Sequence, residues 1–148
     1  MKGNLDLSRV ALANMTWGFF LLFVAACGGA FVALHLTEAF MSQNVAPNWQ
    51  STLQTSSHGH TSLFGIIHVL LGLTIPYDGQ TNKIRVLKSI ALFCGSFAMG
   101  PLMLMRSAFG PAASTSWTGI LVGVALAVAL FGVLSHSVDL FRRLAFRG

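Results

Sequence analysis

The chain has 148 residues, of which 54% are hydrophobic and only 9% are charged, about a third of the charged fraction typical of soluble domains. This composition excludes an ordinary water-soluble globular domain and makes the lipid bilayer the expected environment. The net charge of +5 does not predict a nucleic-acid partner, because the basic residues sit between apolar stretches and form no continuous patch.

Four apolar stretches follow one another along the chain, at about 12–36, 59–76, 86–105 and 118–136. Each is long enough to cross a hydrocarbon core of about 30 Å as a helix that rises about 1.5 Å per residue. Together with their short connections they use nearly the whole chain. We therefore predict an all-α fold, an integral membrane four-helix bundle that forms one domain over residues 1–148.

Several residues within these stretches predict how the helices pack. Gly119, Gly123 and Ala127 recur at intervals of four, a pattern of small residues that allows two helices to approach closely in a bundle or an oligomer. Gly100 and Pro101 predict a kink in the third helix, because proline removes one backbone hydrogen bond. The polar segment 42–57 predicts a loop between the first two helices.

The distribution of basic residues predicts the orientation. Eight of the nine lie before the first stretch, around the connection between the second and third, or after the fourth: Lys2, Arg9, Lys83, Arg85, Lys88, Arg142, Arg143 and Arg147. Because Lys and Arg are enriched in cytoplasmic segments, we expect both termini in the cytoplasm of a cell with a bacterial-type inner membrane. Only Arg106 is left for the external side.

With this topology, His35, His58 and His60 all fall at the external boundary, together with Glu38 and Arg106. Imidazole is the usual ligand of haem iron, copper and zinc. These residues predict either a haem held by the histidines, with Arg106 on a propionate, or a copper or zinc ion held by the histidines and Glu38. The alternative is that each histidine merely reaches the headgroup region from a helix end.

The two other histidines lie at different depths. His68 lies about 15 Å along its helix from His58, deep in the bilayer. It is either a neutral side chain that is hydrogen-bonded to a neighbour, or a candidate second metal site or proton relay. His136, close to Arg142 and Arg143, is expected at the cytoplasmic interface.

The segment from His58 to Gly65, with His60 two residues after His58, opens the second helix from the external side. It resembles helix 2 of haem–copper oxidase subunit I and of small four-helix bacterial membrane proteins related to that subunit. The resemblance implies that His58 is an axial ligand of a low-spin haem near the external face. It leaves His35, His60 or a neighbouring subunit as the source of the second axial ligand, because His136 lies on the wrong side.

The oxygen-reducing centre of the large oxidases is not expected, since the later helices contain neither an adjacent His-His pair nor a His-Pro-Glu-Val-Tyr pattern. We therefore expect a b-type cytochrome that exchanges electrons with a quinone or an external carrier, or that senses a gas. The alternative is a non-redox accessory subunit of a larger complex or a homo-oligomer. The motifs of common soluble enzymes are missing, so the sequence leaves open whether the chain is an enzyme.

Overall fold

The computed structural model describes residues 8–42, 49–109 and 116–146, and it contains helices but no strands within these ranges. The helices are α1 (Arg9–Met41), α2 (Trp49–Thr74), α3 (Asn82–Phe97), α4 (Met103–Ala108) and α5 (Trp117–Ala145), with short helical turns η1 (Ile75–Tyr77) and η2 (Ala98–Leu102). Because α3, η2 and α4 run on continuously, the described ranges contain four helices long and apolar enough to span a membrane. The all-α prediction is confirmed, and the structure fits a multi-pass membrane protein.

The helices extend further than the apolar stretches predict. α2 begins at Trp49, about ten residues before the predicted start, so the predicted loop is wrong for its second half; residues 43–48 lie outside the described part of the chain. Leu53 and Ser57, within the polar segment, are buried. The backbone hydrogen bonds of a helix can continue beyond the hydrocarbon core, so a helix need not end where the hydropathy of its sequence falls.

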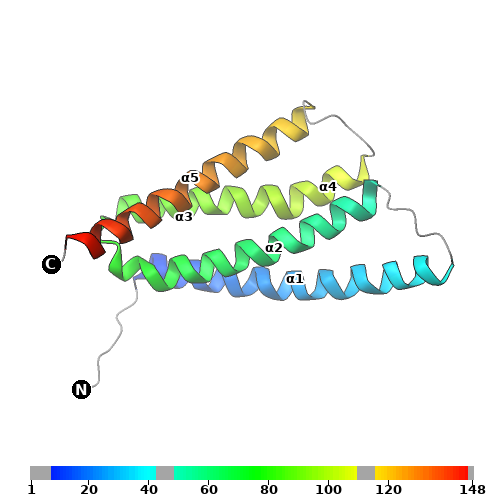
Figure 1. Ribbon diagram of the computed structural model, residues 1–148, viewed down its shortest axis with the longest axis horizontal. Coiled ribbons are helices and arrows are strands. Elements are labelled where there is room, and N and C mark those ends of the chain that lie inside the picture. The colour runs from blue at the N-terminus through cyan, green and yellow to red at the C-terminus, as the bar shows by residue number, and fades with distance from the viewer. Residues whose placement is uncertain (1–7, 43–48, 110–115, 147–148) are drawn as a thin grey trace, which may run out of the picture.

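The helices lie side by side in the order α1, α2, α3 with α4, and α5, so that α1 and α5 occupy opposite edges (Figure 1). α1 packs along α2, and α5 packs along α3. The start of α1, the turn between η1 and α3, and the end of α5 share one end of the molecule, which we call the termini end. The opposite end is called the far end.

Glycines bring α1 and α2 into close contact. A Cβ atom added at Gly18 of α1 would lie 2.6 Å from the carbonyl oxygen of Gly65 in α2, and one added at Gly72 would lie 2.7 Å from the carbonyl oxygen of Ala11. Without side chains at these positions the two backbones approach closely, as is common between membrane helices. α1 and α2 therefore form a tightly packed pair.

The predicted stripe of small residues on α5 does not face its neighbours in the chain. A Cβ atom at Gly123 would meet nothing within 4 Å, and Ala127 is exposed. Instead, Ala129 packs against Gly95 of α3, and Gly132 faces Ala91. The pattern of small residues at intervals of four therefore did not predict the face by which α5 packs against α3.

The kink predicted at Gly100 and Pro101 coincides with an interruption of the regular α-helix. These residues lie in η2, a single turn of π-helix between α3 and α4. The hydroxyl of Ser57 in α2 donates a hydrogen bond of 2.9 Å to the carbonyl oxygen of Gly100. This bond joins α2 to the third span at the point where the regular helix is interrupted.

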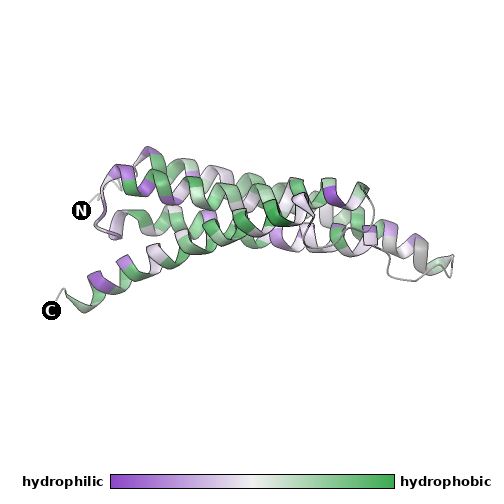
Figure 2. Ribbon diagram, turned by 90° about the horizontal axis from the view of Figure 1, so that it is seen from above, coloured by the Kyte–Doolittle hydropathy of each residue, from purple (hydrophilic) through white to green (hydrophobic). Residues whose placement is uncertain are grey.

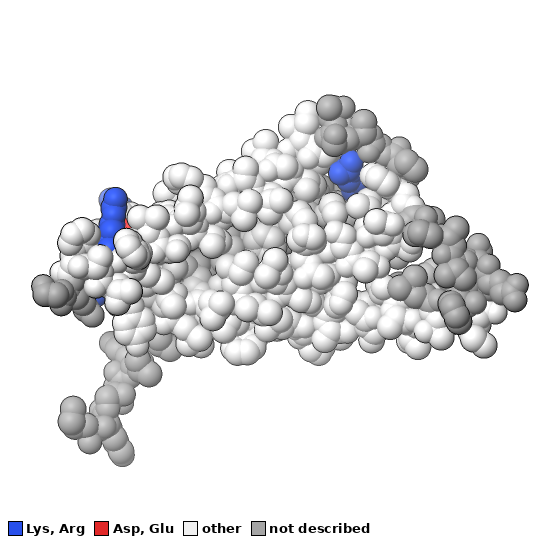
Figure 3. Space-filling model, in the orientation of Figure 1, with Lys and Arg blue, Asp and Glu red and all other residues white. Residues whose placement is uncertain are grey.

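The surface of the molecule matches a membrane environment. Hydrophobic residues run along the middle of all the helices (Figure 2), and many large apolar side chains are exposed. On the face drawn in Figure 3, Lys and Arg lie at the two ends, with an uncharged region between them. An exposed apolar belt is stable where lipid replaces water.

The contact between α1 and α2 predicts unequal effects of one substitution at two glycines. Gly18→Ala places a methyl group against the backbone of α2, which cannot move aside without separating the helices. We expect a loss of about 1–3 kcal/mol from overpacking, partly offset by a gain of about 1 kcal/mol in helix propensity. Thermal unfolding in detergent measures the difference.

Gly123→Ala is the matched control, because the same methyl group meets open space there. We expect this variant to be as stable as the wild type or slightly more stable. Equal melting temperatures for the two variants would show that α1 and α2 do not approach as closely as described.

Candidate functional site

His58 lies in the wall of a cavity near the far end. The cavity has a volume of about 280 Å³ and is lined by Val24, Ala25, Gly28, Phe31, Val32, Gln54, Ser57, His58, Thr61 and Leu104. The imidazole packs against Gly29 of α1, where an added Cβ atom would lie 2.6 Å from its Cε1 atom. Its Nδ1 atom is buried and has no hydrogen-bond partner. His58 is thus the one ionisable side chain among these lining residues.

His60 has a different environment from His58. Its Nδ1 atom lies 2.7 Å from the carbonyl oxygen of Ser56, one turn earlier in α2. Because a carbonyl only accepts hydrogen bonds, Nδ1 carries the proton and Nε2 holds a lone pair. Two residues of helix turn a side chain by about 200°, so His58 and His60 face different directions.

The structure places His35 and Glu38 on the exposed surface of α1. The His35 ring stacks on Phe31, with ring centroids 6.3 Å apart. His35 follows Gly29 by six residues, which places it about 9 Å further along α1 and turned by about 240° from the position that contacts His58. The structure therefore does not bring His35 to the level and the direction of His58, as the sequence had suggested.

Arg106 lies near Trp49. Its guanidinium group is 5.2 Å from the centre of the Trp49 ring, and the Trp49 indole donates a hydrogen bond of 3.4 Å to the Arg106 carbonyl oxygen. This pair ties the start of α2 to α4 and also fits the aromatic belt expected at a membrane interface.

No group of three or more His, Cys, Asp or Glu side chains is arranged to hold a metal ion within the described ranges. The copper or zinc site predicted on His35, Glu38, His58 and His60 therefore gains no support. The position of His35 further along α1, and the rotation of α2 between His58 and His60, separate these imidazoles.

His68 is the centre of a polar network deep between α1, α2 and α3. It is 1% exposed, and its Nδ1 atom lies 3.0 Å from Oδ1 of Asn14. The amide nitrogen of Asn14 donates to the carbonyl oxygen of Val10 at 2.8 Å and to the hydroxyl of Ser89 at 2.7 Å. Because the Asn14 oxygen must accept, His68 carries its proton on Nδ1, and its buried Nε2 has no partner.

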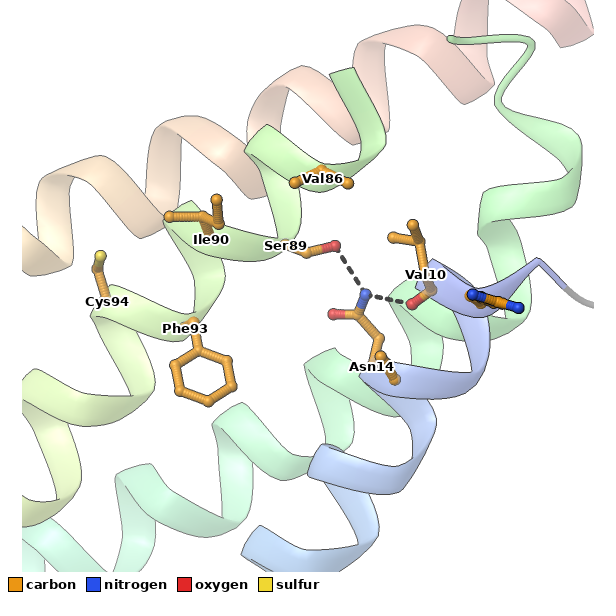
Figure 4. Close-up of a pocket in the computed structure, with 9 residues that line it drawn as sticks. Val10, Asn14, Val86, Ser89, Ile90, Phe93 and Cys94 are labelled. Atoms are coloured by element: carbon orange, nitrogen blue, oxygen red, sulfur yellow. Dashed lines mark hydrogen bonds between the residues drawn. The ribbon is translucent and has the colours of Figure 1, made fainter. Parts of the chain in front are cut away.

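A groove of about 510 Å³ runs past this network on the face between α1 and α3 (Figure 4). It is lined by Arg9, Val10, Ala13, Asn14, Val86, Ser89, Ile90, Phe93 and Cys94. His68 does not line it, because Asn14 and Phe93 lie between, and the His68 ring meets Phe93 edge-on at 6.0 Å. The sequence left open whether His68 is a neutral, hydrogen-bonded side chain or part of a second site. Hydrogen bonding to a neighbour accounts for its Nδ1 atom, but its Nε2 atom has no partner.

Charged side chains meet at the termini end, which the sequence analysis did not foresee. Lys88 of α3 is buried, and its Nζ atom lies 2.5 Å from Oδ2 of Asp139 in α5. Asp78 has a fully buried carboxylate whose Oδ1 accepts hydrogen bonds from Arg85 at 2.9 and 3.0 Å. Arg85 and Lys88 were assigned to a loop, but both belong to α3. The signal in the sequence was Asp139, an acid on the last helix that needs a basic partner.

His136, which was expected at the cytoplasmic interface, lies beside this cluster at the termini end and is buried against other helices. Its Nε2 atom lies 2.7 Å from the hydroxyl of Thr74 in α2, and its Nδ1 atom lies 3.9 Å from Oδ2 of Asp78. The sequence did not predict these contacts, because α5 continues about nine residues beyond its predicted end.

The Lys88–Asp139 pair predicts a rescue by a second substitution. Lys88→Met leaves the carboxylate of Asp139 without its partner in a region of low dielectric constant, and we expect a loss of about 3–5 kcal/mol in unfolding free energy. The double variant Lys88→Met with Asp139→Leu removes both charges and should recover most of this loss, as measured by unfolding in detergent. If the double variant is less stable than Lys88→Met alone, the pair does not join α3 to α5 in the way described.

Comparison of the chain with protein-family models, curated proteins and solved structures finds no match. The function is therefore inferred from the geometry of the chain's own residues.

Proposed function

We propose that the chain is a membrane-embedded b-type haem protein in which His58 is the axial ligand. The observation that carries the proposal is the buried, unpartnered Nδ1 atom of His58 in the wall of an otherwise uncharged cavity. A buried polar atom without a partner costs about 1–3 kcal/mol. If the imidazole coordinates a haem iron, this function accounts for a buried histidine that costs the fold stability.

The other walls of the cavity suit a flat, apolar macrocycle. Gly28 leaves open space beside the cavity, since a Cβ atom there would meet nothing within 4 Å. Val24 and Phe31 are exposed, so the rim reaches the membrane-facing surface. At about 280 Å³ the cavity is slightly smaller than ligand pockets of about 300–1,000 Å³, and a haem would extend beyond this rim.

The residues that line the cavity include no second histidine, and no cysteine or methionine. Within one chain His58 would therefore be the only axial ligand, and the sixth position of the iron would stay open. Of the two roles expected from the sequence, this favours gas sensing. Electron transfer to a quinone or an external carrier would instead need a second ligand from a neighbouring subunit, because His35 and His60 face away.

We also propose that the termini end faces the cytoplasm in a bacterial-type inner membrane, with the His58 cavity near the external face. Basic residues at the termini end support this orientation: Arg9, Lys83, Arg85, Lys88, Arg142 and Arg143, against Arg106 in α4. Excess Lys and Arg on one side set the topology of most multi-pass proteins.

The second candidate function is a non-redox subunit of a homo-oligomer or larger membrane complex. The face of α5 that carries Gly123 and Ala127 favours it, because these small residues have no neighbour within the described chain. Small residues on an open face allow another helix to pack closely. In this case the purified protein would contain no haem.

The visible spectrum of the protein, purified from cells supplied with a haem precursor, tests the main proposal. We expect a Soret band and, after reduction with dithionite, a carbon monoxide difference spectrum typical of an open sixth position. His58→Ala should lose at least 90% of the haem per chain, while His60→Ala should retain it. A colourless wild-type protein, or unchanged haem in His58→Ala, would end the proposal.

Gly29→Ala tests the same ligand without removing it. The added methyl group would meet the His58 ring at 2.6 Å and displace it, so we expect lower haem occupancy or a shifted Soret band. Gly59→Ala is the control, since its methyl group meets open space on α2, next to His58 in the sequence, and its spectrum should equal that of the wild type.

Reporter fusions test the orientation. A green fluorescent protein fused after residue 148 should fluoresce, since it folds in the cytoplasm, and an alkaline phosphatase fused at the same point should be inactive. The reverse pair of results would place the His58 cavity on the cytoplasmic side.

A further inference from the structure

A second cavity lies at the termini end, between the turn that follows η1 and the end of α5. It has a volume of about 440 Å³ and is lined by Asp78, Gly79, Gln80, Asp139, Arg142, Arg143 and Phe146. The haem proposal makes no use of it. The groove beside Asn14 has one charged residue in its lining, Arg9, whereas this cavity has both acidic and basic side chains in its walls.

The charges around this cavity are unequal. Asp78 is neutralised by Arg85, and Asp139 by Lys88. Arg142 interacts electrostatically with Asp139, but neither Arg142 nor Arg143 forms a close ion pair or a hydrogen bond with another described residue. The cavity therefore has an excess of two positive charges, and its unused N–H donors suit an anion.

The turn beneath the cavity fixes the position of Arg143. Gly79 has a φ of +71°, and a Cβ atom there would lie 2.5 Å from Nε of Arg143. The guanidinium group thus lies over the bare backbone of Gly79 instead of pairing with a carboxylate. A planar guanidinium whose donors remain free is suited to bind phosphate oxygens in pairs.

The depth of the cavity identifies the source of the phosphate. Arg142 and Arg143 lie in the last turn of α5, at the end of a span, and the neighbouring Phe146 ring is 84% exposed. An exposed aromatic ring next to basic side chains is typical of the boundary between acyl chains and headgroups. We infer that Arg142 and Arg143 bind the phosphate of an anionic phospholipid headgroup at the termini end. The site does not depend on the proposed haem function.

Native mass spectrometry of the full-length protein tests this inference. The protein is released from micelles that contain equal amounts of phosphatidylglycerol and phosphatidylcholine, and the lipid that stays bound is identified. We expect phosphatidylglycerol to dominate. Arg142→Gln and Arg143→Gln should each weaken its binding about fivefold, the effect typical of one basic side chain near an anionic membrane surface.

Lys83→Gln is the matched control, because it removes one exposed positive charge at the same end but outside the cavity. We expect little change in this variant, and an equal loss would overturn the site in favour of general surface attraction. Gly79→Ala keeps every charge but displaces Arg143, so it should also weaken binding of phosphatidylglycerol. Unchanged binding in Gly79→Ala would contradict the role of the turn.

Two further arms identify the ligand. Inorganic phosphate is added at millimolar concentration to protein in phosphatidylcholine micelles, and it should leave the melting temperature unchanged, whereas phosphatidylglycerol should raise it. Stabilisation by inorganic phosphate equal to that by phosphatidylglycerol would show that a soluble anion, not a lipid, occupies the cavity. Only variants that elute as a single species are compared, so that a folding defect is not mistaken for lost binding.

Discussion

A polar side chain within a hydrocarbon layer has no water to bind, so it must find its partner inside the protein. This constraint determines how the helices of this chain meet. Asn14 and Ser89 join α1 to α3, Ser57 reaches the carbonyl group of Gly100 in η2, and the Lys88–Asp139 pair joins α3 to α5. Each of these contacts lies between two helices and fixes one relative position, which apolar packing alone specifies less sharply.

The same constraint separates structural polar groups from candidates for function. His60 and His136 each have one ring nitrogen bonded to a protein oxygen, and the Asn14 amide holds one nitrogen of His68. Among these four histidines, only His58 has no hydrogen bond to its ring, and its Nδ1 is buried. It also lines a cavity, whereas His68 is shielded from the neighbouring groove. A ligand gains most at a side chain that has an unsatisfied polar atom and lines a cavity, and His58 meets both conditions.

The sequence predicted four apolar helices, because hydropathy and helical rise depend on composition and count alone. It did not predict the direction of each side chain around its helix. His58 and His60 lie close together along α2 but point apart, and His35 lies about 9 Å further along α1 than the residue that contacts His58. Similarly, Lys88 was counted as a topological charge, because its partner Asp139 lies 51 residues away and only the packing of α3 on α5 brings the two together. Angular position depends on tertiary contacts that a single sequence does not reveal.

The position of His58 follows from the packing of α1 on α2. Residues 58, 65 and 72 are spaced by sevens, so they lie on nearly the same face of α2. Gly65 and Gly72 on this face allow α1 to approach closely. At position 58 the face carries an imidazole instead of a glycine, and the residue of α1 that contacts it is Gly29, which leaves room for the ring. The ring is held between two helices that contact each other along their length. A ligand placed in this way loses little conformational entropy on coordination, which is the condition for a preorganised site.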